Sequence, residues 1–296
     1  TFILALVTAF RESQPVQNST LWPELLGKFP SHQVPFLKDE DDLPDSPRRL
    51  ALVLAYEGSR FAGWQLQPGK RTVQEEVEKI LSTLCDEPVR IEASGRTDAG
   101  VHALGQVATF STMSRLSLER MRRGLGSLLP GDVHARELGA VPNRFHARFD
   151  CKAKTYHYYL WPSAEAALFL DNRLWAIKQE LNAPGISKAL ELLMGEHDFL
   201  AFSSRLGQVE EGSTVRRVLE AELEAEGPIW RVRLTGTGFL RHVVRNLVGT
   251  LVQIGMGRLE PEVVSEMLQA RQRIYAGPKA PAGGLYLSKV FYREPI

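Results

Sequence analysis

The sequence predicts an α+β fold in which helices cover one face of mostly antiparallel sheets. Between residues 48 and 149, apolar runs and amphipathic segments follow one another as strand, helix, strand, strand, helix and strand. This order is typical of a split β-α-β unit, and residues 150–296 repeat it loosely. A chain of 296 residues is also long enough for about two domains. We therefore expect two related α+β halves, 48–149 and 150–296.

The first 47 residues differ from the rest of the chain. They contain six prolines and the acidic run Asp39–Asp42, a composition that disfavours a packed core. We expect a poorly structured N-terminal extension over residues 1–47, and its composition indicates no function.

The first half opens with the near-continuous apolar run Leu50–Tyr56, which indicates a buried strand. Thr72 and Glu75 form a capping box, and apolar residues at helical spacing then predict a helix that ends before Pro88. Two strands, a helix and a final strand are expected at Val89–Ala93, Gln106–Phe110, Ser117–Leu129 and Val133–Leu138.

The second half opens with an aromatic strand, Thr155–Trp161. The later elements are expected in the order helix, strand, strand, helix, helix and strand, at Ile186–Met194, Val218–Glu224, Ile229–Thr235, Arg241–Ile254, Pro261–Arg271 and Gly284–Tyr292.

The amino-acid composition limits the classes of protein to which this chain can belong. The chain is 44% hydrophobic and 24% charged, as in globular enzymes. Its two cysteines, Cys85 and Cys151, and its seven histidines form no metal-binding or disulfide pattern. We therefore expect no protein-bound metal, and a reducing, cytoplasmic location. The net charge is +1 although the extension is acidic, so the remainder is modestly basic, which suits a polyanionic partner.

The loop Ala93–His102 carries a candidate catalytic group. Asp98 follows Arg96 by two residues, and Gly95 and Gly100 flank the pair between two predicted strands. Glycines let a backbone turn sharply or approach another molecule closely, and loops between strands often display functional groups. The alternative is that Asp98 only hydrogen-bonds its own backbone in a local turn.

Two segments interleave basic and aromatic side chains, as surfaces that neutralise phosphates and stack on bases do. The first is Tyr56–Gln65, which contains Arg60 and is followed by Arg71. The alternative is that Phe61 and Trp64 belong to the core.

The second basic segment runs from Arg144 through Arg148 and Lys154 to Tyr156. The density of cations indicates a segment that follows a phosphate backbone, and the alternative is a solvated linker.

A third cluster, Gly236–Asn246, places two arginines at the start of a predicted helix. Arg241 and Arg245 are four residues apart, so they share one helix face. A helix N-terminus favours anions, so their partner is a phosphate or an internal carboxylate such as Asp98. The alternative is a surface salt bridge.

The order of short motifs along residues 48–292 resembles the TruA-type tRNA pseudouridine synthase family. The central motif is Ser94–His102, followed by Gly105-Gln106-Val107. The other matching motifs are Tyr56–Ser59, Phe61–Gln65, Arg71–Gln74, Leu129–Asp132, Phe145–Arg148, Lys154–Tyr156, Gly195–Phe199, Phe239, Val244–Asn246 and Ala282–Tyr286. The extension 1–47 has no counterpart in the family.

The resemblance implies a pseudouridine synthase fold, with two ferredoxin-like halves whose sheets join around a basic RNA-binding cleft. It implies isomerisation of uridine at positions 38, 39 and 40 of the tRNA anticodon stem-loop, by a homodimer without metal or organic cofactor. Asp98 matches the family's catalytic aspartate, Arg96 and Arg245 match arginines at the catalytic site, and Tyr156 matches the tyrosine that packs against the target base. The RNA-binding residues expected from the basic clusters are Arg60, Arg71, Arg144, Arg148, Lys154 and Arg241.

The chemistry of this reaction suits the residues. The N1–C1′ bond must break, the uracil must rotate and C5 must bond to C1′, so no redox cofactor is required. Asp98 can act as a nucleophile or stabilise a cationic sugar carbon, and Arg96 or Arg245 can keep it ionised. The target uridine must be flipped out of its stack, and Tyr156 is suited to stack on it. The alternatives are a non-catalytic RNA-binding protein and a nucleoside hydrolase, for which a second carboxylate is missing.

Overall fold

The computed structural model describes residues 34–36, 47–162, 170, 172–204, 214–225, 228–272 and 277–293. Most of the predicted extension 1–47 lies outside these residues. Within it, Val34 is buried in the core of the first half, and Phe36 packs so close to Gly139 that a Cβ there would lie 2.5 Å from its ring.

The elements of the first half follow the predicted order. The strands are β1 (Arg48–Tyr56), β2 (Glu92–Ala93), β3 (His102–Thr112) and β4 (Val133–Ala140), and the helices are α3 (Val73–Cys85) and α4 (Leu118–Leu128).

The second half contains two short strands that the sequence did not predict, β6 (Trp175–Ala176) and the polar β7 (Gly195–Asp198). The other strands are β5 (Ala153–Trp161), β8 (Val215–Glu224), β9 (Trp230–Gly236) and β10 (Leu285–Phe291). The helices are α6 (Ala183–Glu191), α7 (Val243–Gly255) and α8 (Val263–Ala270).

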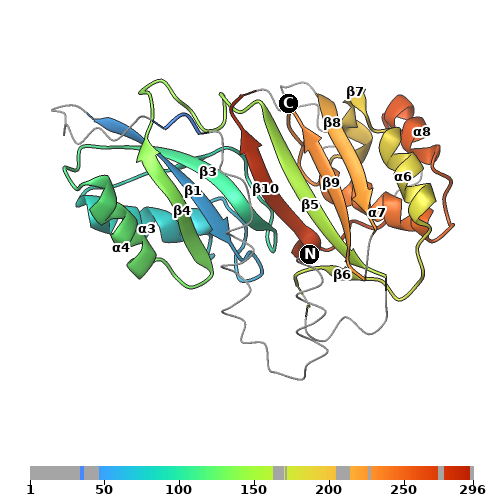
Figure 1. The fold of residues 1–296 in the computed structure, drawn as a ribbon, viewed down its shortest axis with the longest axis horizontal. Coiled ribbons are helices and arrows are strands. Elements are labelled where there is room, and N and C mark those ends of the chain that lie inside the picture. The colour runs from blue at the N-terminus through green and yellow to red at the C-terminus, as the bar shows by residue number, and fades with distance from the viewer. Residues whose placement is uncertain are drawn as a thin grey trace.

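One sheet runs through both halves (Figure 1). Its strand order is β4-β1-β3-β10-β5-β9-β8-β7, with β2 beside β3 and β6 beside β5. Among these pairs, only β3–β10 and β5–β6 are parallel, so the predicted α+β fold with mostly antiparallel pairing is confirmed. The last strand, β10, lies in the centre of the sheet and joins the two halves.

Two hydrophobic cores lie under this sheet. The first packs α3 and α4 on β1 and β3, where Leu50–Leu54 is fully buried as predicted. The second packs α6, α7 and α8 on β5, β9 and β8, and Figure 1 shows these helices at the opposite end of the molecule from α3 and α4. Tyr156 packs against both cores and therefore marks their junction.

Local signals in the sequence predict the starts of the two helices in the first half. The Thr72 side chain accepts the N–H of Glu75 at 3.3 Å, as the capping box predicts, and Ser117 caps α4 in the same way.

The strand predicted over Val89–Ala93 shortens to β2. The N–H groups of Val89 and Ile91 donate to the side chains of Ser82 and Glu78 on α3. These N–H groups are therefore used by a helix and not by a neighbouring strand.

Candidate active site

The loop that carries Asp98 is fixed at its start by β3. The Gln106 side chain accepts a hydrogen bond from the Ser94 hydroxyl and donates one to the Gly95 carbonyl, both at 2.7 Å. The N–H of Ser94 donates to the Val107 carbonyl at 2.8 Å. The loop therefore leaves the sheet in a defined direction.

The loop between β1 and α3 supports the Asp98 loop from behind. Trp64 donates its N–H to the Thr97 carbonyl at 3.1 Å, and Gly100 donates to the Phe61 carbonyl at 3.3 Å. The Tyr56 hydroxyl lies 2.8 Å from the Thr97 hydroxyl. Phe61 and Trp64 are buried, at 3% and 2% exposure, so they belong to the core, and their proposed stacking on bases is wrong.

Asp98 faces the beginning of α7, which comes from the other half of the chain. His242 Nε2 lies 3.3 Å from Asp98 Oδ2, Arg245 Nη1 lies 3.8 Å from the same oxygen, and Arg241 Nε lies 3.9 Å from Oδ1. The side chains of Arg245 and His242 are nearly buried, whereas that of Arg241 is 71% exposed. Three basic side chains and a helix N-terminus thus converge on one carboxylate.

The start of α7 is itself held on two sides. Arg245 donates through Nε to the Ala280 carbonyl at 2.7 Å, and Ala280 donates its N–H to the Arg245 carbonyl at 3.1 Å. On the other side the Asn246 amide donates to the Phe202 carbonyl at 2.6 Å. The guanidinium of Arg245 is therefore oriented toward Asp98 before any substrate binds.

Tyr156 lies on β5 at the junction of the two cores. Its ring meets that of Phe239 edge-on, with the centroids 5.3 Å apart. Burial raises the pKa of the Tyr156 phenol, and the neighbouring Tyr56 and Asp98 raise it further, so the hydroxyl stays protonated at neutral pH. No hydrogen bond joins this hydroxyl to another residue in the described part of the chain, so it is available to a substrate.

The sequence predicts two other functional arginines, Arg96 at the catalytic site and Arg71 as an RNA contact. Arg96 is exposed, and within the described ranges it forms no ion pair with Asp98. Arg71 is engaged inside the first half: its guanidinium donates to both carboxylate oxygens of Asp132, at 2.7 and 2.9 Å, and to Glu76 at 2.7 Å. It also covers the Phe61 ring. Arg71 therefore holds the loop between β1 and α3 against the loop that precedes β4.

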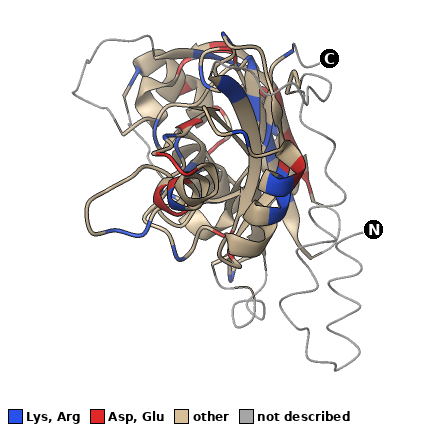
Figure 2. Ribbon diagram, turned by 90° about the vertical axis from the view of Figure 1, so that its left-hand side faces the viewer, with Lys and Arg blue, Asp and Glu red and all other residues tan. Residues whose placement is uncertain are grey.

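The second basic segment presents its cations on the surface. Arg144, Arg148 and Lys152 are exposed, and Phe149 is 76% exposed. The turn is held by His146, whose Nδ1 accepts the N–H groups of Arg148 and Phe149, at 3.0 and 3.4 Å. Figure 2 shows Lys and Arg distributed over strands and helices and interspersed with Asp and Glu.

Lys154 connects this segment to the Asp98 loop. A Cβ on Gly95 would lie 3.0 Å from its Nζ. Burial, together with Arg148 and Arg216, lowers the pKa of Lys154, although Cys151 opposes the shift. The close approach to Gly95 places the ammonium group next to the first turn of the loop.

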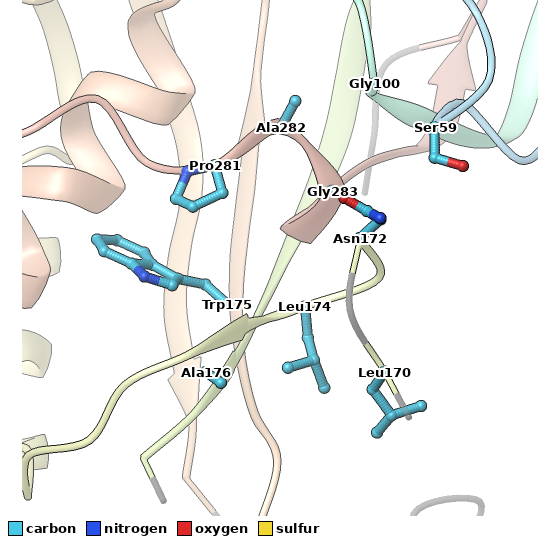
Figure 3. A pocket seen from close by; sticks show the side chains of 10 residues that line it. All are labelled: Ser59, Gly100, Leu170, Asn172, Leu174, Trp175, Ala176, Pro281, Ala282 and Gly283. Atoms are coloured by element: carbon cyan, nitrogen blue, oxygen red, sulfur yellow. The ribbon is translucent and has the colours of Figure 1, made fainter. Parts of the chain in front are cut away.

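A pocket of about 330 Å³ lies beside the Asp98 loop and not at the carboxylate (Figure 3). Ser59 and Gly100 line one side, and Trp175 and Pro281–Gly283 line the other. Neither Asp98 nor Tyr156 borders this pocket, so it is distinct from the group of basic residues around Asp98.

His242 is the site residue that the sequence reasoning missed. It lies inside the Gly236–Asn246 cluster, between a glycine-rich turn and an apolar helix, and this position was its only signal. Among the described residues, no group of His, Cys, Asp and Glu side chains has the arrangement of a metal site. In that same part of the chain, no helix is long and apolar enough to cross a membrane.

The chain is similar to a family of RNA-modifying enzymes. The family model described as tRNA pseudouridine synthase matches residues 52–150 and 189–293. The tRNA pseudouridine synthase A of Geobacillus kaustophilus is 43% identical over 248 residues, which cover 83% of this chain and 95% of the relative. That of Anoxybacillus flavithermus is 42% identical over 83% of this chain and 99% of the relative. That of Ruminiclostridium cellulolyticum is 39% identical over 83% of this chain and the whole of the relative.

Proposed function

This chain belongs to the tRNA pseudouridine synthase family, and we propose that it isomerises uridine in the anticodon stem-loop of tRNA with Asp98 as its catalytic carboxylate. One observation carries the assignment of Asp98. Its carboxylate is the point on which Arg241, His242 and Arg245 converge from the opposite half of the molecule. A carboxylate in a merely local turn needs no such surroundings.

The groups around Asp98 fit the steps of the reaction. Asp98 attacks C1′ of the ribose, or stabilises positive charge there, as the N1–C1′ bond breaks. The freed uracil rotates until C5 faces C1′, and a C5–C1′ bond forms while any bond between Asp98 and C1′ breaks. C5 then loses its proton and N1 gains one. Tyr156 stacks on the uracil while it is detached, and its neutral hydroxyl is free to bond to the nucleotide.

The arginines have separate roles in this proposal. The side chain of Arg245 is nearly buried and is held by Ala280, so it keeps a fixed positive charge next to Asp98. Arg241 and Arg96 are exposed, so they contact the phosphates of the flipped nucleotide.

The outer RNA contacts are assigned to exposed or partly exposed cations. Arg60, Arg144, Arg148 and Lys154 follow the phosphate backbone, whereas the engagement of Arg71 with Asp132 argues for a structural role. We place the enzyme in the cytoplasm, and we expect a homodimer, as the family resemblance implies.

The decisive experiment replaces Asp98 by asparagine. Asp98→Asn should form no pseudouridine in a tRNA transcript, as mapped by carbodiimide adducts, while its affinity for tRNA and its thermal unfolding stay close to those of the wild type. Asp86→Asn is the matched control, since Asp86 is exposed at the end of α3 and its loss should leave turnover unchanged. Wild-type turnover by Asp98→Asn would refute the assignment.

The same assay separates the two other functions. A non-catalytic RNA-binding protein would bind the transcript and leave every uridine unmodified. A nucleoside hydrolase would release free uracil, which chromatography detects.

A further inference from the structure

His242 has an unusual backbone conformation for its place in the fold. Its φ of 66° lies in the left-handed region, which is unfavourable for residues other than glycine. Of the other described non-glycine residues with positive φ, Asp86 and Arg271 end helices α3 and α8, where this conformation is common. Asn172 belongs to a residue type that tolerates it. His242 instead precedes the first residue of a helix.

The beginnings of other helices show what His242 lacks. Thr72, Ser117 and Asn182 precede α3, α4 and α6 with extended backbone, and each side chain accepts a hydrogen bond from the helix. His242 makes no such cap. Its conformation therefore does not stabilise α7 through its side chain, and backbone strain of this kind tends to occur at functional sites.

The left-handed turn directs the imidazole at the catalytic carboxylate. Nε2 lies 3.3 Å from Asp98 Oδ2, and the side chain is only 15% exposed. The guanidinium groups of Arg241 and Arg245 stay 3.9 and 3.8 Å away, which is beyond hydrogen-bonding distance. Of the three basic side chains, the imidazole is thus nearest to forming a hydrogen bond with Asp98.

The surroundings favour the neutral form of this imidazole. Burial lowers the pKa of His242, and Lys279, Arg241 and Arg245 lower it further, while Asp98 is the group that opposes the shift. A neutral imidazole with its proton on Nε2, 3.3 Å from Oδ2, can donate one hydrogen bond to that oxygen and adds no positive charge.

We propose that His242 is a positioning residue for the isomerisation: it orients the Asp98 carboxylate through one hydrogen bond at Oδ2 and leaves Oδ1 free to act on the sugar. The inference rests on the proposed function of Asp98. A neutral donor holds the carboxylate without the strong pairing that a charged donor would impose. When His242 is protonated in acid, it pairs more tightly with Asp98 and slows the reaction.

Three variants test this role. His242→Gly removes the imidazole and relieves the backbone, so the protein should be at least as stable as the wild type. Its kcat should fall about 10- to 100-fold because the carboxylate is no longer oriented, with KM for tRNA unchanged. His242→Gln, which carries an N–H donor at a similar reach, should recover most of the lost kcat. Asp86→Gly is the control, since it relieves the same conformation at the end of α3 and should leave kcat unchanged.

The pH profile separates positioning from a purely structural role. The kcat of the wild type should fall on the acid side as His242 gains its proton, and His242→Gln should not show that limb. Full kcat in His242→Gly, failure of His242→Gln to recover activity, or identical acid limbs in wild type and His242→Gln would each overturn the proposal.

A measurement without turnover keeps this test independent of the proposed function. The C2 proton of His242, followed by NMR in the wild type and in Asp98→Asn, should titrate at lower pH in the variant because the favourable carboxylate is gone. Equal titration in both proteins would show that His242 and Asp98 do not interact. If the wild type forms no pseudouridine but the two titrations still differ, the proposed function is refuted while the interaction between His242 and Asp98 stands.

Discussion

Replacing Gly63 by alanine tests whether the Asp98 loop is held by close contact with the backbone behind it. Gly63 has a φ of 98°, and a Cβ at this position would lie 2.8 Å from the Thr97 carbonyl oxygen and 3.1 Å from the Ala99 nitrogen. Both atoms belong to the loop that carries Asp98. The substitution therefore introduces backbone strain and also pushes on the catalytic loop.

The two effects can be separated by a second glycine. Gly69 has a φ of 67°, but a Cβ there meets nothing within 4 Å, so Gly69→Ala costs only the conformational term of about 1–2 kcal/mol. Gly63→Ala adds the overlap with the loop, which costs about 1–3 kcal/mol more. The free energy of unfolding should thus drop by about 2–5 kcal/mol for Gly63→Ala.

Urea unfolding and single-turnover pseudouridine formation are the assays. Gly63→Ala should lose about tenfold or more in turnover because it displaces Asp98, whereas Gly69→Ala should keep wild-type turnover. Gly126→Ala, in the interior of α4 with open space around it, should instead stabilise the protein by about 0.5–1 kcal/mol. Equal losses of stability at Gly63 and Gly69, with full turnover in both, would refute the proposed backbone support.

Two further predictions concern RNA binding and acid stability. Arg144→Ala combined with Arg148→Ala should weaken tRNA binding and reduce the slope of log K against log salt by about 1.5, since two phosphate contacts are lost; an unchanged slope in filter binding would contradict these contacts. Burial, with Arg231 and Arg233 adding to it, lowers the pKa of His157 to about 3 from its ordinary 6.5. The unfolded chain therefore binds a proton below about pH 6.5 that the folded protein does not, so stability is lost as pH falls. Between pH 7 and pH 5 the wild type should lose about 2 kcal/mol more than His157→Gln in urea unfolding, and parallel losses would refute the prediction.

Much of the fold could be predicted because its signals are local. The capping residues Thr72 and Ser117 lie next to the helices they start, and the apolar run Leu50–Tyr56 is itself the buried strand. The position of β10 could not be predicted, because its parallel pairing joins Tyr286 to His102 across a long stretch of chain. No local pattern states which neighbours a strand will find.

Part of the candidate site could likewise be predicted from local signals in the sequence, and part could not. Asp98 could be found from its own loop, since glycines and charges alternate within a few residues. The interpretation of Phe61 and Trp64 as RNA contacts failed because an aromatic residue next to a cation looks the same in sequence whether it is buried or exposed. His242 was missed because its importance depends on the left-handed turn and on a carboxylate from the other half.

The geometry of the candidate site depends on the seam between the two halves. Asp98 comes from the first half, Arg245 and His242 from the second, and β10 lies between β3 and β5 at the point where they meet. Hydrogen bonds made by side chains hold the two halves together along this seam. His102 Nδ1 accepts the Gly58 N–H at 3.0 Å, so its proton is on Nε2, which donates to the Asn172 carbonyl at 2.8 Å.

The β10 side of the seam is equally constrained. Tyr286 stacks on His102 with ring centroids 4.5 Å apart and donates its hydroxyl to the Arg173 carbonyl at 2.9 Å. Gly284 approaches the ring of Tyr158 so closely that a Cβ would lie 2.6 Å from it. Close-packed interiors transmit strain. A substitution in the seam should therefore change the distance from Asp98 to α7, even where the substituted residue contacts neither of them. Activity should therefore be more sensitive than tRNA affinity to changes at the seam, since the exposed Arg144 and Arg148 lie outside it.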